Sequence, residues 1–354
     1  MSASVWIMAG GTGGHIYPAM ALAQALRERG WRVQWLGGPA PSMESRLVPE
    51  AGFEMLTLSM GGVRGKGLGT WLRLPLNLMR ALWQSLSLLR RHRPALLVGF
   101  GGYITFATGA LAALTGRPLF LHEQNAIAGT ANRWLAPLAR RCFTAFPKVL
   151  TKGEWIGNPL RTALLAVPEP AQRYGQRQGP LRVLVVGGSL GAQALNALVP
   201  QALALMPADQ RPHVIHQTGD KHWEQAQANY QQAGVAVDLR AYIPDMATEL
   251  AQADLVIARS GASTVTEVAA VGVAAAFVPF PHAIDDHQTA NARFLSDAGA
   301  ALLLPQHSLS PQGLAELLTQ HTREDLLDRA QRARALGQRE ATQQLLQACE
   351  EVLA

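Results

Sequence analysis

A glycine-rich stretch near the start of the chain carries the first residues that could do chemistry. GGTGGH, residues 10–15, follows the apolar segment 5–8 and precedes apolar residues that recur at helical spacing. This order predicts a strand, a tight turn and a helix N-terminus, where backbone N–H groups and the helix dipole favour an anion. The glycines could also serve strand–helix packing alone. His15 closes the stretch and titrates near neutral pH, so it is a candidate general base.

Two familiar phosphate-binding motifs do not fit this turn. No lysine follows the glycines as a Walker sequence requires, and Ile16 stands where the dinucleotide-binding pattern has its third glycine. The predicted second strand lies in residues 31–40, which contain no acid to bind a ribose. The sequence therefore disfavours nicotinamide and flavin cofactors.

The glycine turn occurs twice in the chain. GGSLG at residues 187–191 repeats the pattern of residues 10–14, again between an apolar strand and a helical pattern. A repeat of this length indicates two similar domains. Residues 157–180 between the copies are rich in proline, glycine and glutamine and suit a linker.

Short apolar runs alternate with helical patterns in both halves of the chain. This alternation predicts an α/β fold of two Rossmann-like, doubly wound parallel-sheet domains, facing each other across a cleft. We place the domains at residues 1–158 and 159–336, with a last helix within 337–354. Ligands of such sheets bind beyond the carboxyl ends of the strands. The unusual residues stand there: His15, Gly101–Tyr103, His122–Asn125, Ser189, Arg259–Gly261 and Pro279–His282.

Composition narrows the possible partners and compartments. The net charge of +6 suggests an anionic partner. The chain has 2 cysteines, without metal spacing or a disulfide framework, which predicts a reducing cytosol. The apolar run nearest to transmembrane length, residues 104–115, is too short to cross a bilayer. The first strand begins at once and leaves no room for a secretory signal.

A set of ordered motifs is more specific than any one of them. In chain order they are GGTGGHIYPA, GGYITF, HEQNAIAGTANR, IGNPLR, VVGGSLGA, ARSGASTVTEVAAVG and HAIDDHQTANA. Together they resemble the MurG family, the N-acetylglucosaminyl transferases of bacterial peptidoglycan synthesis. The resemblance implies a GT-B fold and an inverting transfer from UDP-N-acetylglucosamine (UDP-GlcNAc) to the 4-hydroxyl of lipid I, giving lipid II. It implies a peripheral protein on the cytoplasmic face of the inner membrane, with residues 337–354 returning to the first domain.

The sequence also bears on how a diphosphate leaving group would be stabilised. Metal-dependent transferases commonly use an Asp-x-Asp motif and a divalent ion, and the chain has no such motif. The two glycine turns remain as devices that stabilise negative charge. We therefore expect transfer without a metal or other cofactor, with the first turn cradling the acceptor pyrophosphate or closing over the donor.

The resemblance assigns UDP-GlcNAc to the second domain. It implies that Ser189 meets phosphate, that the backbone at Ile243 reads uracil and that Glu267 accepts the ribose hydroxyls; an early-helix glutamate also simply favours the dipole. Arg259 is a less certain candidate beside Arg161. The full set implied for the donor is Thr12, Gly13, Gly14, Asn125, Arg161, Ser189, Ile243, Ala262, Ser263, Thr264, Val265, Thr266, Glu267 and Gln288.

Inversion needs one base for the acceptor hydroxyl and no protein nucleophile. His15 is the first candidate, although a histidine there could equally bind phosphate or hold the loop. Glu123 is the second candidate, and we expect His122 to be structural. Tyr103 could contact the acceptor or be packed.

One basic, apolar segment suits a membrane surface. Residues 55–122 contain no Asp or Glu, and their centre, residues 69–93, predicts a helix with a narrow polar stripe. One side could pack on the sheet, while the basic residues attract anionic phospholipid. A buried core helix with a basic edge is the alternative. Nucleic acid is disfavoured because the segment is leucine-rich and poor in aromatic residues. The candidate membrane residues are Trp71, Leu72, Leu76, Met79, Arg80 and Trp83.

Three other functions keep the same architecture. A UDP-GlcNAc epimerase would leave the basic segment without a role, a sensor would bind the nucleotide sugar without turnover, and a sister transferase would use another acceptor. Other proteins of cell-wall synthesis are further possible partners implied by the resemblance.

Overall fold

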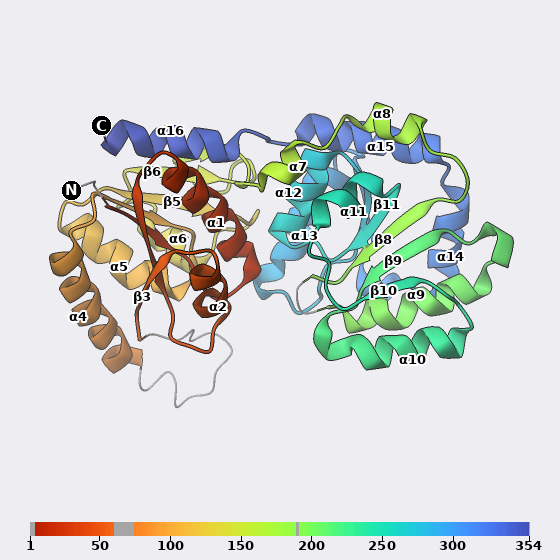
Figure 1. The fold of residues 1–354 in the computed structure, drawn as a ribbon, viewed down its shortest axis with the longest axis horizontal. Helices are drawn as coiled ribbons and strands as arrows, with labels where there is room; N and C mark the ends of the chain where they lie inside the picture. The colour runs from red at the N-terminus through yellow and green to blue at the C-terminus, as the bar shows by residue number, and fades with distance from the viewer. Residues whose placement is uncertain (1–3, 60–73, 189–190, 354) are drawn as a thin grey trace. The chain divides into compact units, whose positions relative to one another are not determined.

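The computed structural model describes residues 4–59, 74–188 and 191–353. The chain forms two compact units (Figure 1). Unit 1 comprises residues 1–161 and 339–354, and unit 2 comprises residues 162–338. No helix within the described ranges combines the length and apolarity that a bilayer crossing needs.

Unit 1 is built on a parallel sheet whose described strands run in the order β3-β2-β1-β4-β5-β6-β7. The strands are β1 (Ser4–Met8), β2 (Arg32–Gly37), β3 (Glu54–Thr57), β4 (Leu96–Gly99), β5 (Leu119–Glu123), β6 (Arg141–Thr144) and β7 (Gly153–Trp155). Its helices are α1 (Gly13–Glu28), α2 (Met43–Glu50), α4 (Leu74–His92), α5 (Gly102–Leu114), α6 (Thr130–Leu135) and α16 (Ala341–Leu353).

The alternation of side chains along β1 builds a core on each face of this sheet. Val5 and Ile7 belong to the cluster that α1 and α16 complete, whereas Trp6 and Met8 belong to the cluster of α4 and α5. The C-terminal helix α16 lies beside α1 (Figure 1) and buries Leu345 fully in this first cluster. Unit 1 therefore needs the last helix of the chain to close its core.

Unit 2 repeats the design with the described strand order β10-β9-β8-β11-β12-β13, all parallel. The strands are β8 (Arg182–Val186), β9 (His213–Gln217), β10 (Asp238–Arg240), β11 (Leu255–Ala258), β12 (Ala274–Phe277) and β13 (Ala301–Leu303). In each sheet the strands are added on one side of the first strand, β1 or β8, and then on its other side. This reversal of strand order is the mark of a doubly wound sheet and confirms the predicted fold class. The helices are α7 (Thr162–Leu165), α8 (Pro170–Gly175), α9 (Gln193–Leu205), α10 (Trp223–Ala233), α11 (Met246–Gln252), α12 (Ala262–Val271), α13 (His287–Ser296), α14 (Pro311–Gln320) and α15 (Arg323–Leu336).

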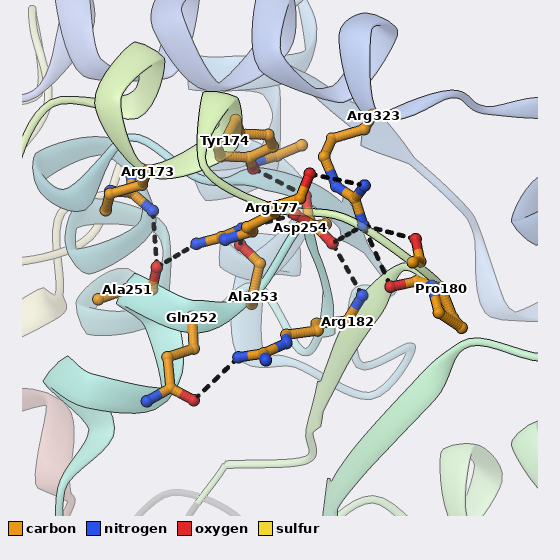
Figure 2. Close-up of polar contacts among 12 residues, drawn as sticks. Arg173, Tyr174, Arg177, Pro180, Arg182, Ala251, Gln252, Ala253, Asp254 and Arg323 are labelled. Carbon is orange, nitrogen blue, oxygen red and sulfur yellow. Dashed lines mark hydrogen bonds and ion pairs between the residues drawn. The ribbon is translucent and has the colours of Figure 1, made fainter.

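The segment 157–180 is not the simple linker that its composition suggests. It forms α7 and α8, and Tyr174 on α8 is buried with its hydroxyl donating to the carbonyl of Asp254 at 2.7 Å. Figure 2 shows Arg177 and Arg323 converging on the carboxylate of Asp254. The ion-pair distances are 2.6 Å for Arg177 and 3.2 Å for Arg323. That carboxylate is fully buried, so both cations are needed to offset its desolvation. These partners lie far along the chain, where local composition cannot reveal them.

Candidate active site

The first glycine turn joins β1 to α1 as predicted. Thr12 is the N-cap residue of α1 in extended conformation, and its hydroxyl does not cap the helix. The hydroxyl oxygen lies instead 3.3 Å from Nδ1 of His15, in the first turn of the helix. Gly11 has a φ of 95°, which favours glycine. The turn therefore holds the histidine ring against Thr12 at the positive end of α1.

The turn after β4 makes room for the same ring. Gly101 has a φ of 87°, and a Cβ added there would lie 3.5 Å from Nε2 of His15 and 3.3 Å from Nδ2 of Asn132. Asn132 on α6 in turn donates to the carboxylate of Glu123 at 2.8 Å. The carboxyl ends of β1, β4 and β5 thus bring together His15, Asn132 and Glu123, all within unit 1.

Sequence reasoning missed a buried acid beneath the first turn. Glu44, in the first turn of α2, is fully buried, and its carboxylate accepts the N–H of Gly11 at 3.2 Å and that of Gly38 at 3.1 Å. A Cβ added at Gly10 would lie 2.6 Å from Oε1 of Glu44, so only glycine lets the carboxylate approach. The acid stands beyond residues 31–40, and its neighbour Ser42, which caps α2, is the one local signal.

Tyr103 stands close to this carboxylate. A Cβ added at Gly38 would lie 2.8 Å from the phenolic oxygen of Tyr103 and 3.0 Å from Oε1 of Glu44. Burial, and then the negative charge of Glu44, raise the pKa of Tyr103. The phenol therefore stays protonated and can donate a hydrogen bond.

Glu123 organises the loop that follows β5. Its carboxylate accepts the backbone N–H groups of Asn125 and Gly129, both at 3.0 Å, as well as the side-chain amide of Asn132. The side chain is buried, 2% exposed. With its oxygens committed to this loop, Glu123 positions Asn125 and is less suited than His15 to take a substrate proton.

His122 is enclosed beneath the same loop. Nε2 donates to the carbonyl of Gly157 at 2.9 Å, and Nδ1 accepts from Gln124 at 3.0 Å. The carbonyl can only accept, which fixes the tautomer. Burial lowers the pKa of His122 to about 4. The imidazole is therefore neutral at pH 7 and supports the loop.

The second glycine turn joins β8 to α9, and Ser189 within it lies outside the described residues. The turn is crowded, because a Cβ added at Gly187 would lie 2.3 Å from the nitrogen of Ala192. Gln217, at the end of β9, donates to the carbonyl of Gly188 at 3.1 Å and accepts the N–H of Ile243 at 3.2 Å. A neutral amide therefore links this turn to the residue expected to read uracil.

The N-terminus of α12 is a candidate anion site in unit 2. The helix begins at Ala262 after Gly261, and its first turn carries no acid. The hydroxyl oxygens of Ser260 and Ser263 are buried there without a hydrogen-bond partner among the residues that the structure describes. Free N–H groups, the helix dipole and two unused hydroxyls can all serve a phosphate.

The other α12 candidates divide between packing and exposure. Ala262, Val265 and Thr266 are buried, and the hydroxyl of Thr266 donates back to the carbonyl of Ala262 at 2.9 Å. Thr264 and Glu267 are half-buried. Of this part of the helix, Ser263, Thr264 and Glu267 are thus the side chains placed to meet a ligand.

Arg259 adds a buried cation at the same end of the sheet. Its guanidinium donates to the carbonyls of Val278 and Pro279, both at 3.0 Å, and to Gln306 at 2.6 Å. Burial lowers its pKa. Among the described residues no carboxylate forms an ion pair with it, so its charge remains to attract an anion.

The loop before α13 holds Gln288. Its side-chain oxygen accepts the N–H of Phe280 at 2.9 Å. Just before it, Asp285 and Asp286 have φ values of 55° and 50°, a left-handed backbone that costs these residues free energy. The role of Gln288 at the donor sugar stays a prediction.

Arg161 belongs to unit 1. Its guanidinium carbon lies 6.0 Å from the ring centroid of Tyr17 on α1, and the residue is exposed. Gly13 and Gly14 form the first residues of that same helix. Arg161 therefore adds positive charge near α1.

The candidate membrane residues on α4 point away from the core. Leu76, Met79 and Trp83 are 65%, 60% and 73% exposed, and Arg80 is exposed among them. The opposite side is buried, and Ser85 there shares a hydrogen bond of 2.8 Å with Thr108 of α5. Trp71 and Leu72 lie outside the described residues. The described part of α4 is thus half-buried, with an apolar outer face.

No group of three or more histidine, cysteine, aspartate or glutamate side chains in the described ranges is arranged to hold a metal ion. After the carboxyl end of β11, Arg259 and the N-terminus of α12 provide positive charge.

Comparison with known proteins gives a consistent picture. The models of the glycosyltransferase family 28 N-terminal and C-terminal domains match residues 5–144 and 182–347. A relative from Bordetella pertussis is 59% identical over 98% of this chain and 97% of its own length. One from Albidiferax ferrireducens is 57% identical over 98% and 90%. Both are named UDP-N-acetylglucosamine--N-acetylmuramyl-(pentapeptide) pyrophosphoryl-undecaprenol N-acetylglucosamine transferase.

Solved structures agree with these matches. The crystal structure of Acinetobacter baumannii MurG is similar with a TM-score of 0.84 and 38% identity over 99% of both chains. A putative UDP-N-acetylglucosamine 2-epimerase from Listeria monocytogenes has a TM-score of 0.69 at 14% identity, covering 99% of this chain and 96% of its own, which shows a shared fold alone.

Proposed function

The chain belongs to the MurG family of glycosyltransferases, and from this we propose that it transfers N-acetylglucosamine from UDP-GlcNAc to lipid I, giving lipid II. The observation that carries the proposal is the identity of 57–59% over 98% of the chain with relatives that bear this activity in their names. The glycine turns, α12 and Arg259 supply chemistry that fits it.

In this proposal unit 2 holds the donor. The N-terminus of α12, Ser263 and Arg259 stabilise the diphosphate, and Glu267 accepts the ribose hydroxyls. Ile243 reads uracil through its backbone, and Gln288 contacts the sugar. As the bond from C1 to the phosphate oxygen breaks, the growing negative charge meets fixed donors that need no rearrangement.

Unit 1 serves the acceptor and supplies the base. The oxygen of the acceptor 4-hydroxyl attacks C1 with inversion, and His15 takes the proton of that hydroxyl. Glu123 holds the loop that presents Asn125 to the sugar. The placement of His15 between Thr12 and Gly101 supports this assignment over Glu123, whose oxygens are already used.

We further propose that transfer proceeds without a metal ion. The support is the buried guanidinium of Arg259 beside a helix N-terminus that carries no acid in its first turn. Enzyme treated with EDTA and assayed in metal-free buffer is expected to keep its rate. A loss that magnesium restores would contradict this.

The protein is also proposed to act as a peripheral protein on the cytoplasmic face of the inner membrane, with the exposed face of α4 against anionic phospholipid. Leu76, Met79 and Trp83 provide apolar contact, and Arg80 provides charge. Contacts with other cell-wall synthesis proteins would be made from the same location.

One assay tests the catalytic proposal. Purified protein is incubated in detergent with radiolabelled UDP-GlcNAc and a lipid I analogue, and the product and its anomeric configuration are determined. A β-linked disaccharide lipid is expected. Solvent deuterium at C2 of the sugar would indicate an epimerase, and binding without turnover would indicate a sensor.

A further inference from the structure

Unit 1 contains a hollow that the proposed reaction does not use. It has a volume of about 550 Å³ and lies between the start of the loop after β5, the end of α6 and the loop that joins β6 to β7. Both loops leave the carboxyl ends of their strands. The hollow therefore opens near the edge of the sheet that carries Asn125, but on other residues.

The lining of this hollow carries positive charge and no acid. Arg133, Lys148 and Lys152 contribute the cations, and no Asp or Glu is among the lining residues. Within the described part of the chain, neither lysine forms an ion pair; Arg133 donates to the carbonyl of Ala128 at 3.2 Å. Only 4 of the 31 basic residues of the chain are lysines, and this hollow holds two of them.

Apart from Thr151, the rest of the lining is apolar, and two exposed apolar residues lie next to lining residues in sequence. Ile127, Val149 and Leu150 form part of the wall. On α6 and just beyond it, Trp134 is 68% exposed and Leu138 is 49% exposed. A site that joins cations to exposed tryptophan and leucine fits an amphiphile better than a small hydrophilic anion.

The backbone at Lys148 supports a fixed position for that charge. Its φ is 60°, in the left-handed region that few non-glycine residues adopt. A strained residue persists only where its surroundings hold it, and such residues cluster at ligand sites. The strained backbone at Lys148 thus supports, together with the charges, a ligand-binding role for this hollow.

The location favours a lipid as the source of the anion. α6 packs against α5, and α5 packs against α4, whose outer face carries Leu76, Met79 and Trp83. We propose that the hollow between α6 and the β6–β7 loop binds the phosphate of an anionic phospholipid. This rests on the proposed membrane location and extends it from the surface of α4 to a defined head-group pocket.

Vesicle binding tests this pocket. The full-length protein is floated with vesicles of phosphatidylcholine alone and of phosphatidylcholine with phosphatidylglycerol. The test variant is K148N/K152Q, because asparagine tolerates the left-handed backbone at position 148. The matched control is Lys221→Gln, which removes an exposed lysine from unit 2.

The double variant is expected to bind anionic vesicles about 30-fold more weakly than the parent chain, from about 1 kcal/mol per basic residue. Lys221→Gln should bind like the parent, and turnover in detergent should be unchanged in all three proteins. Trp83→Ala, by contrast, should weaken binding to both kinds of vesicle.

Two outcomes would contradict the proposed head-group pocket and leave the proposed transferase activity unaffected. In one, the double variant binds anionic vesicles within twofold of the parent. In the other, millimolar inorganic phosphate protects the two lysines from chemical modification whereas anionic vesicles do not, which identifies a site for soluble anions. A parent chain that turns over in detergent but never binds anionic vesicles would overturn the membrane proposal together with this one.

Discussion

The two glycine turns look alike in sequence and differ in what lies beside them. At the first turn a buried carboxylate, Glu44, accepts the N–H of Gly11. At the second, the neutral amide of Gln217 donates to the carbonyl of Gly188. Each side chain also holds a neighbouring segment, Gly38 in the first case and Ile243 in the second. The same backbone device is therefore braced by a negative charge in one unit and by no charge in the other.

This difference bears on the prediction that the first turn cradles the acceptor pyrophosphate or closes over the donor, which stays a prediction. The N–H of Gly11 already donates to Glu44, and a carboxylate repels an anion that binds close to it. At the second turn the bracing side chain is a neutral amide. The two turns thus share a backbone pattern and differ in their electrostatics.

Replacement of Glu44 by alanine has the largest expected effect on this comparison. The N–H of Gly38 is buried, and a buried N–H left without an acceptor costs about 1–3 kcal/mol, whereas the N–H of the exposed Gly11 can bond to water. Together with the loss of the contacts of a fully buried side chain, the change should lower the free energy of unfolding of unit 1 by about 3 kcal/mol. Urea unfolding followed by tryptophan fluorescence reports on unit 1, because Trp223 is the one tryptophan of unit 2. Glu44→Gln keeps one acceptor oxygen and should lose about half as much. An alanine variant as stable as the parent would contradict the conclusion that Glu44 braces the first turn.

His15 distinguishes the turns chemically, since Ala192 stands at the equivalent position of the second turn. His15→Ala should lower kcat by about 10²-fold or more through loss of the base, with little change in the KM for UDP-GlcNAc. Steady-state kinetics at saturating acceptor measures both constants. A fall in kcat of less than about tenfold would remove His15 from the role of base.

A carboxylate introduced at the second turn has a smaller expected effect, and it tests the electrostatic difference between the turns directly. Gln217→Glu places a carboxylate beside Gly188, as Glu44 lies beside Gly11, and should weaken UDP-GlcNAc binding by about tenfold, or about 1.4 kcal/mol. Calorimetric titration at pH 7 and pH 5 measures the effect, which should shrink at the lower pH as the acid protonates. Gln217→Leu is the uncharged control. If both variants bind equally, charge is not what separates the turns.

Low pH should destabilise the two units by similar amounts, so the units are not expected to differ in this property. Burial lowers the pKa of His122 in unit 1 to about 4 and that of His216 in unit 2 to about 3, from 6.5. Between the folded pKa and pH 6.5, each of these histidines binds a proton in the unfolded chain but not in the folded one. The free energy of unfolding therefore falls as the pH is lowered through this range. Each histidine should cost about 1 kcal/mol between pH 6.5 and 5.5. Urea unfolding across this range, with His122→Gln and His216→Gln as flatter controls, measures the slope.

Local patterns predicted the parts of the fold that depend on neighbours in sequence. The apolar runs that end at Met8, Gly37 and Val186 are strands, because short, largely continuous apolar runs flanked by glycines predict buried strands. The helix in residues 69–93 was likewise foreseen, and its described part is α4.

What escaped prediction depends on partners distant in the chain. From the sequence of its own helix, Glu44 would be expected to be exposed to solvent. Its burial is explained only by the N–H groups of Gly11 and Gly38, which lie elsewhere along the chain and donate to it. Tyr174 gains its meaning only from Asp254. Candidate site residues were proposed from motifs, whereas the residues that brace those motifs leave little local signal: for Glu44 it is only the helix cap at Ser42.

The position of α16 has a consequence for how the protein is made. Leu345 and Cys349 are fully buried in unit 1, although the whole of unit 2 separates them in sequence from the rest of that unit. Unit 2 is continuous in sequence and can fold as soon as it leaves the ribosome. Unit 1 is begun first but must wait, with part of its apolar surface uncovered, until α16 has also been made.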